Sequence, residues 1–180
     1  MTDITARKDG DRRIVSGIAI PFNENSVDLG GFLEQFAPSA VEYTLRRGVD
    51  VRALSGHDSV RLLGRVTART LAITKDARGL RYELDLPDTS DGRDVFELVR
   101  RRDLTGASFA FSIRDSGEVW DFSGRLPLRT ITDSLIREIS LVAWPAYPTT
   151  TASVSNTRSQ RPAARSLAWL EKWHRNQLAR

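Results

Sequence analysis

His57, Ser108 and Glu138 are the residues of this 180-residue chain whose types could together perform acyl transfer. Such chemistry needs a hydroxyl nucleophile, a base that accepts the proton of this hydroxyl, and a third group that orients the base. The chain has two histidines, and the second one, His174, lies in a C-terminal tail that differs in composition from the rest. We therefore expect His57 to be the base if the chain uses a serine nucleophile.

Ser108 lies in a segment in which apolar residues occupy every second position. These residues are Ala107, Phe109 and Phe111, and their spacing predicts a strand with the Ser108 hydroxyl on the face opposite to them. A serine at such a place is usually only a surface residue, and an isolated histidine such as His57 is usually structural. The residue types therefore allow catalysis but do not by themselves require it.

Glu138 is our first choice for the third group. It is surrounded by Ile136, Ile139 and Leu141 in a segment that predicts a strand, an unfavourable place for an unpaired charge. The competing interpretation is a structural ion pair, for example with Arg65. Asp58 and Asp133 are the alternative third residues.

Seven short segments occur in an order that is typical of one group of viral enzymes. The segments are residues 16–23 (SGIAIPFN), 31–34 (GFLE), 56–58 (GHD), 63–65 (LGR), 79–80 (GL), 106–111 (GASFAF) and 138–148 (EISLVAWPAYP). In these segments the chain resembles the capsid-maturation (prohead) serine proteases of tailed phages, which are similar to the herpesvirus assemblin fold. Each segment alone is unspecific, whereas seven in register form a specific match.

The resemblance implies a serine endopeptidase that cleaves the major capsid protein precursor, scaffold segments and itself. It would act in the host cytoplasm, inside the immature capsid. Ser108 would attack, His57 would transfer the proton, and Glu138 would orient the imidazole. Assemblin-like enzymes have a second histidine as the third group, and the chain before its tail has none. A carboxylate must therefore replace it, or the site must work as a dyad.

A non-catalytic scaffold or capsid-assembly protein of the same fold is the alternative function. The GHD and GASF segments favour the protease, because a scaffold needs neither. Nucleic-acid binding is not expected, because the net charge of +4 comes from the tail. Six basic residues and one acidic residue lie within 158–180, and the remaining chain has one more acidic than basic residue.

The composition predicts neither a cofactor nor a metal site. The absence of cysteine excludes disulfides and thiolate ligands. No segment has the roughly 18 apolar residues of a membrane span, so no membrane partner is expected. Self-association is left open by the sequence.

Short alternating segments predict an α+β fold that is mainly β. We expect a closed or nearly closed barrel of about six to eight strands with flanking helices. Strands are predicted at 14–20, 49–53, 80–86, 107–113 and 135–143, with weaker signals at 65–73, 118–122 and 128–131. Helices are predicted at 39–47 and 91–102, the second capped by Ser90 or Asp91.

The chain is predicted to have three parts. Residues 1–148 form the protease barrel domain, and the polar residues 149–164 form a flexible linker. Residues 165–180 form a basic amphipathic C-terminal helix with an apolar stripe of Leu167, Leu170, Trp173 and Leu178. This helix would dock either on its own barrel or on an acidic assembly partner.

Overall fold

The structure is a computed structural model that describes residues 2–147 and 150–152. In chain order the elements are β1 (Thr2–Asp9), β2 (Arg12–Pro21), β3 (Leu33–Phe36), the 3-10 helix η1 (Pro38–Val41), α1 (Glu42–Arg47), β4 (Arg52–Ser55), β5 (Asp58–Arg65), β6 (Leu71–Lys75), β7 (Gly79–Leu86), α2 (Ser90–Arg101), β8 (Gly106–Ile113), β9 (Glu118–Asp121), β10 (Leu128–Ile131), β11 (Ser134–Val142) and β12 (Thr150–Ala152). The predicted C-terminal helix at 165–180 and most of the predicted linker lie outside the described residues.

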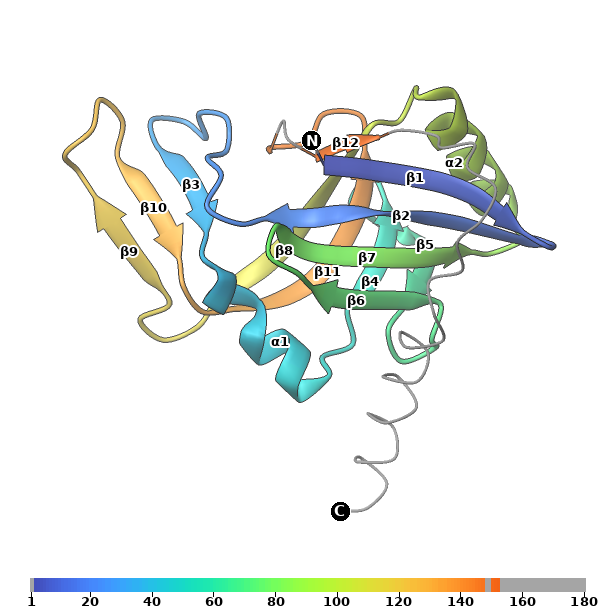
Figure 1. Ribbon diagram of the computed structural model, residues 1–180, viewed down its shortest axis with the longest axis horizontal. Helices are drawn as coiled ribbons and strands as arrows, with labels where there is room; N and C mark the ends of the chain where they lie inside the picture. Colours follow the sequence, from blue (N-terminus) through green and yellow to red (C-terminus); the bar gives the residue numbers. More distant parts are fainter. Residues whose placement is uncertain (1, 148–149, 153–180) are drawn as a thin grey trace, which may run out of the picture.

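The strands form three separate sheets (Figure 1). A five-stranded sheet has the order β12-β1-β2-β7-β6, a four-stranded sheet the order β5-β4-β11-β8, and a three-stranded sheet the order β3-β10-β9. The mainly β composition agrees with the sequence, but the predicted closed or nearly closed barrel is wrong, because none of these sheets closes on itself. The described residues contain two α-helices, both short, of which α1 follows η1 directly.

The two larger sheets fail to form a barrel because their edges are not joined by hydrogen bonds. Closure requires a ladder between the last and first strands. Among the described strands, the edge strand β8 lies against the edge strand β12, and β5 lies against β6, but neither pair forms a ladder. Alternation along the sequence predicts one buried face for each strand and carries no information on closure.

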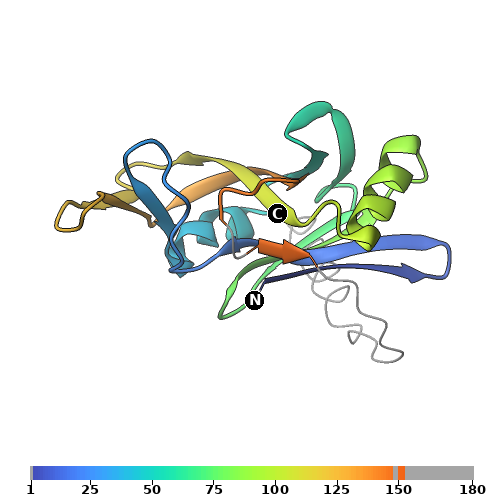
Figure 2. The same cartoon turned by 90° about the horizontal axis from the view of Figure 1, so that it is seen from above.

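One hydrophobic core lies between the two larger sheets, which form two layers in Figure 2. The five-stranded sheet contributes Val15, Ile20, Leu80 and Leu84, and the four-stranded sheet contributes Ala107, Ile136, Ile139 and Leu141. At one end α2 packs against β1, β2, β5 and β7. At the other end the three-stranded sheet extends away from the layers (Figure 1).

Most predicted elements appear close to their expected places. The strict alternation at 80–86 becomes β7, and the segments 107–113 and 128–131 become β8 and β10. The single strand predicted at 65–73 is wrong, because a turn separates β5 from β6 there. The expected cap of α2 is also wrong: Thr89 caps it, since its side chain accepts a hydrogen bond from Gly92 N at 3.2 Å.

Strand β12 lies within the range 149–164 that the sequence predicts as a linker. It pairs in parallel with β1, so that Thr2 lies opposite Thr150 and Ile4 opposite Ala152. The first residues after the predicted domain end thus extend the five-stranded sheet. No helix in the described part of the chain is long and apolar enough to cross a membrane.

Candidate active site

His57 lies in the tight turn between β4 and β5. Gly56 and His57 are the two loop residues between the paired Ser55 and Asp58, with φ angles of 63° and 62°. Positive φ at both loop positions is the geometry of a type I′ hairpin turn, and glycine adopts it without a steric penalty. For His57 the same φ is unfavourable and needs support from neighbouring groups. The support comes from β11, where Leu141 O accepts a hydrogen bond from Gly56 N at 3.0 Å.

A β-bulge in β11 determines the face on which Glu138 lies. Ile136 is paired with Phe111 and Glu138 with Ala110, so that Arg137 is an extra residue without a partner in β8. In a regular strand, Ile136 and Glu138 would point to the same face. The bulge lets Ile136 and Ile139 share the core face, and it turns Glu138 to the opposite face.

Glu138 and His57 are in direct contact. His57 Nδ1 hydrogen-bonds to Glu138 Oε1, which links the β4–β5 turn to β11. An ionised carboxylate only accepts hydrogen bonds, so it selects the imidazole tautomer with the proton on Nδ1 and leaves Nε2 free to accept a proton. The side chain of His57 is 44% exposed and that of Glu138 is 14% exposed. The imidazole is therefore accessible from solvent while its partner is mostly covered.

Ser108 lies on the strand next to Glu138, with its side chain on the same face. In the β8–β11 register Ser108 is opposite Ser140, and directly opposed residues of an antiparallel pair project to one side. Ser108 is half-buried, while its neighbour Ala107 is 1% exposed and belongs to the core. Within the described residues, Ser108 Oγ has no hydrogen bond to His57. In unliganded enzymes such bonds are often long and shorten only with substrate.

The structure places the two alternative carboxylates away from the imidazole contact. Asp58 accepts a hydrogen bond from Val60 N at 2.9 Å, which makes it part of a local turn. Asp133 forms an ion pair with Arg114 at 3.0 Å. Arg65, which we considered as a partner of Glu138, instead pairs with Asp50. Of the three candidate carboxylates, Glu138 is thus the one that contacts His57.

Ser140 also belongs to this cluster, although it is not among the residues predicted from the sequence. Its hydroxyl hydrogen-bonds to Glu138 Oε1 and to His57 N, both at 3.1 Å. A signal was present in the sequence, because Glu138 and Ser140 are two polar residues at a spacing of two that alternate with the apolar Ile139 and Leu141. This spacing places both side chains on one face.

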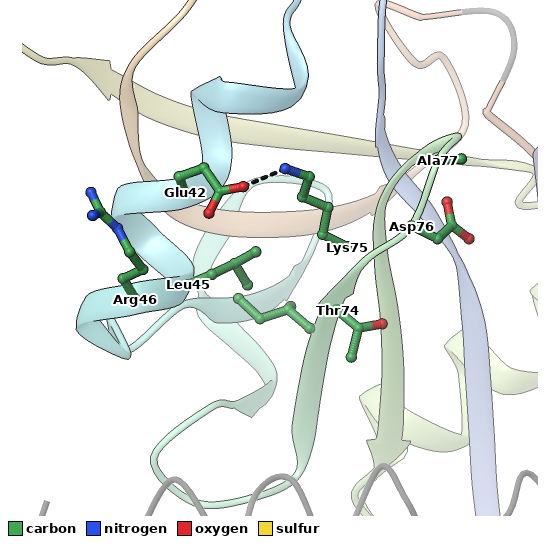
Figure 3. A pocket seen from close by; sticks show the side chains of 8 residues that line it. Glu42, Leu45, Arg46, Thr74, Lys75, Asp76 and Ala77 are labelled. Carbon is green, nitrogen blue, oxygen red and sulfur yellow. Dashed lines mark hydrogen bonds and ion pairs between the residues drawn. The ribbon is translucent and has the colours of Figure 1, made fainter. Parts of the chain in front are cut away.

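A surface hollow of about 870 Å³ lies between α1 and β6 (Figure 3). Its lining includes Leu45 and Arg46 from α1 and Thr74 from β6, and Lys75 pairs with Glu42 across it. None of His57, Ser108, Glu138 or Ser140 lines this hollow. It is therefore distinct from the histidine cluster and offers no nucleophile paired with a base.

No group of three or more histidine or acidic residues that could hold a metal ion occurs in the described ranges 2–147 and 150–152. The site instead provides a solvent-accessible base, His57, whose tautomer is fixed by Glu138, and the hydroxyl of Ser108 on the neighbouring strand β8. This arrangement can support nucleophilic chemistry by a serine.

Comparison with known families gives one match that covers most of the chain. The model of a family described as Caudovirus prohead serine protease matches residues 2–164. A search of curated proteins gave no match. The family match includes the β4–β5 turn, β8 and β11, and it extends beyond Pro148, where we expected the protease domain to end.

Proposed function

The chain belongs to the Caudovirus prohead serine protease family, and we propose that it is an endopeptidase that uses Ser108, His57 and Glu138 to cleave capsid and scaffold precursors. The family places the protein among the serine proteases that act in the maturation of bacteriophage capsids. Its substrates would be the major capsid protein precursor, scaffold segments and the protease itself. The cleavage would take place in the host cytoplasm, inside the immature capsid.

In the proposed reaction, Ser108 Oγ attacks the carbonyl carbon of the scissile peptide bond while His57 Nε2 takes the hydroxyl proton. His57 then gives this proton to the leaving amine, and an acyl-enzyme remains on Ser108. Water activated by the same imidazole hydrolyses the ester in the second half-reaction. Glu138 holds the Nδ1 proton and stabilises the imidazolium that forms in each step. Backbone amides near Ser108 would stabilise the oxyanion.

The contact between His57 and Glu138 is the single observation that carries this proposal. It joins the only histidine of residues 1–173 to a mostly covered carboxylate. Both residues lie beside Ser140, which is directly opposite Ser108. In a structural ion pair Glu138 would face a permanently charged arginine, whereas its partner is an imidazole, which can accept and release a proton.

Co-expression with the capsid precursor of the same phage tests the proposal. The intact masses of both proteins, measured by mass spectrometry, should show defined truncations with the wild-type chain and none with Ser108→Ala. Ser112→Ala is the matched control, because Ser112 lies on the same strand and face and is also half-buried. Equal processing by wild type and a folded Ser108→Ala variant would reject the serine mechanism. Absence of processing by both would favour a non-catalytic role in assembly.

A further inference from the structure

Ser140 occupies the point at which the three strands of the candidate site meet. It lies on β11, which is flanked by β4 on one side and β8 on the other (Figure 1). Its register partners are Leu54 on β4 and Ser108 on β8. The residue is fully buried, with a relative exposure of 0%. A buried hydroxyl must find hydrogen-bond partners inside the protein, because burial without them is costly.

The directions of the two Ser140 hydrogen bonds follow from the chemistry of the groups. The backbone N–H of His57 can only donate, so Ser140 Oγ accepts at 3.1 Å. An ionised Glu138 carboxylate can only accept hydrogen bonds, so the Ser140 hydroxyl donates its one hydrogen bond to Oε1, at an Oγ–Oε1 distance of 3.1 Å. The same oxygen, Oε1, also accepts the hydrogen bond from His57 Nδ1. Ser140 therefore connects the backbone of His57 to the carboxylate that holds its ring.

These bonds compensate for the unfavourable backbone conformation of His57. With a φ of 62° the residue is held in the left-handed region, which is unfavourable for a residue other than glycine. Gly56 N donates to Leu141 O, and His57 N donates to Ser140 Oγ, so consecutive residues of β11 bind consecutive residues of the turn. The turn is thereby fixed relative to the strand that lies opposite Ser108.

We propose that Ser140 is a positioning residue that sets the imidazole of His57 and the carboxylate of Glu138 in the orientation needed for proton transfer from Ser108. This inference rests on the proposed serine mechanism and adds a fourth residue to it. Ser140 acts through its neighbours and does not contact the substrate. Its hydroxyl donates a hydrogen bond to Glu138 Oε1 and so keeps this oxygen directed at His57 Nδ1. Its Oγ also accepts a hydrogen bond from the backbone N–H of His57.

Ser140 is not itself the nucleophile. Its oxygen accepts from the backbone of His57, and its proton is bound by Glu138, so the hydroxyl has no bond to the imidazole ring. Its exposure of 0% also prevents the approach of a peptide carbonyl. Ser108, half-buried and on the outer strand of this sheet, is the serine of this pair that a substrate can reach.

Labelling of the purified full-length protein with a fluorophosphonate probe tests this role without a known peptide substrate. Such a probe reacts with a serine activated by a base, and peptide mapping by mass spectrometry identifies the labelled residue. We expect labelling of Ser108 in the wild type and a rate about ten- to hundredfold lower in Ser140→Ala, the range expected for loss of a hydrogen bond to a charged group. If wild type labels at Ser140, or Ser140→Ala labels as fast as wild type, the inference is wrong. If the wild type does not label at all, the proposed serine mechanism itself fails.

Ser134→Ala is the matched control. Ser134 is on the same strand, is also 0% exposed, and donates its hydroxyl proton to Ala40 O at 2.9 Å, so the substitution removes a comparable buried hydrogen bond. It should lower thermal stability about as much as Ser140→Ala while leaving the labelling rate within roughly threefold of wild type. A rate loss equal to that of Ser140→Ala would show that general loosening of β11, and not positioning, is responsible.

A double-mutant cycle separates positioning from a purely structural role. Because Ser140 acts partly through Glu138, Ser140→Ala should slow labelling less in a Glu138→Gln background than in the wild-type background. Equal losses in both backgrounds would contradict the inference. If Ser140→Ala does not fold, Ser140→Cys replaces the hydroxyl with a weak donor of similar shape and should show the same ordering of rates. Wild-type rates in a folded Ser140→Cys variant would also contradict it.

Discussion

Two carboxylates on neighbouring parts of the molecule look alike in the sequence but have different surroundings. Glu34 lies on β3 in the three-stranded sheet, and Glu138 lies on β11 in the four-stranded sheet. Both side chains are mostly covered, with exposed fractions of 7% and 14%. Glu34 is bound by Tyr147 at 3.1 Å and by Arg129 at 3.4 Å, whereas Glu138 is bound by a histidine and a serine.

The partners of each carboxylate decide what it can do. A guanidinium remains protonated, so Arg129 contacts Glu34 as a fixed positive charge that exchanges no proton with it, and this contact links β3 to β10. An imidazole can accept a proton on one ring nitrogen while the other nitrogen stays hydrogen-bonded, so the contact of Glu138 with His57 can support a cycle of proton transfer. A buried mid-strand carboxylate is therefore not by itself evidence of a catalytic site.

The largest effect on the cleavage rate is expected from loss of the Ser108 hydroxyl, which lies on β8 of the four-stranded sheet. Ser108→Ala should lower the rate of precursor cleavage by about a millionfold, as other triad knockouts do, because no other group takes over the attack. His57→Ala should be nearly as inactive. Cleavage followed by gel electrophoresis and intact mass measures both variants, and circular dichroism verifies that each is folded. Substantial cleavage by either folded variant would contradict the assigned roles.

The same substitution at the two glutamates gives the sharpest test of the comparison. Glu138→Gln should lower the cleavage rate by about a hundredfold to ten-thousandfold, because the amide keeps the shape of the carboxylate and loses its charge. Glu34→Gln should leave the rate within about tenfold of wild type, provided that the assay temperature keeps it folded. If Glu34→Gln is the less active of the two, the distinction between structural and catalytic carboxylate is wrong.

A smaller effect concerns pH and stability in the three-stranded sheet. Burial raises the pKa of Glu34, although the hydrogen bond from Tyr147 and the charge of Arg129 oppose the shift. A carboxyl whose pKa is higher in the folded state stabilises the fold below its unfolded pKa and loses this contribution as the pH rises through the folded pKa. The free energy of unfolding of the wild type relative to Glu34→Gln should therefore fall as the pH rises above the ordinary carboxyl range of about 4. Denaturant titrations at several pH values measure it, and a rise with pH would contradict the assignment.

The smallest effect is expected at Asp50, which precedes β4. A hydrogen bond from Arg65 is the main cause that lowers the pKa of Asp50 to about 2, and bonds from Thr67 contribute. A carboxyl with a lowered pKa stabilises the fold above its unfolded pKa, and this contribution is lost as the pH falls toward about 2. Asp50→Asn should cost about 1 kcal/mol of unfolding free energy at neutral pH, and the difference should shrink on acidification. Chemical denaturation at neutral and acidic pH measures the difference, and a constant difference would contradict this account.

Much of the secondary structure and part of the candidate site could be predicted from the sequence. The alternation of Leu80, Tyr82 and Leu84 with polar residues predicted β7, because one buried face imposes a period of two. The scarcity of histidine pointed to His57, and the resemblance to the protease family added Ser108. The family match confirms the resemblance, whereas the role of Ser108 stays a prediction. Strands β1, β3 and β5 were not predicted. Charged residues interrupt the apolar pattern in β1 and β5, and β3 has only four residues, one of which is the buried Glu34.

The sequence by itself determined the inventory of reactive groups and the local conformations that could present them. It contains one histidine before the tail, no cysteine, and a glycine before that histidine which suits a type I′ turn. These properties depend on residue types and on neighbours in the chain, so tertiary contacts are not needed to recognise them.

Only the tertiary structure decided which carboxylate meets the imidazole and whether the sheets close. Glu138 reaches His57 because the bulge at Arg137 shifts the strand register, and Ser140 joins them because β11 lies between β4 and β8. The expected barrel was wrong for the same reason, since closure depends on hydrogen bonds between strands that are distant in sequence. Register and edge pairing are set by the packing of whole sheets, and a local pattern of residues does not encode them.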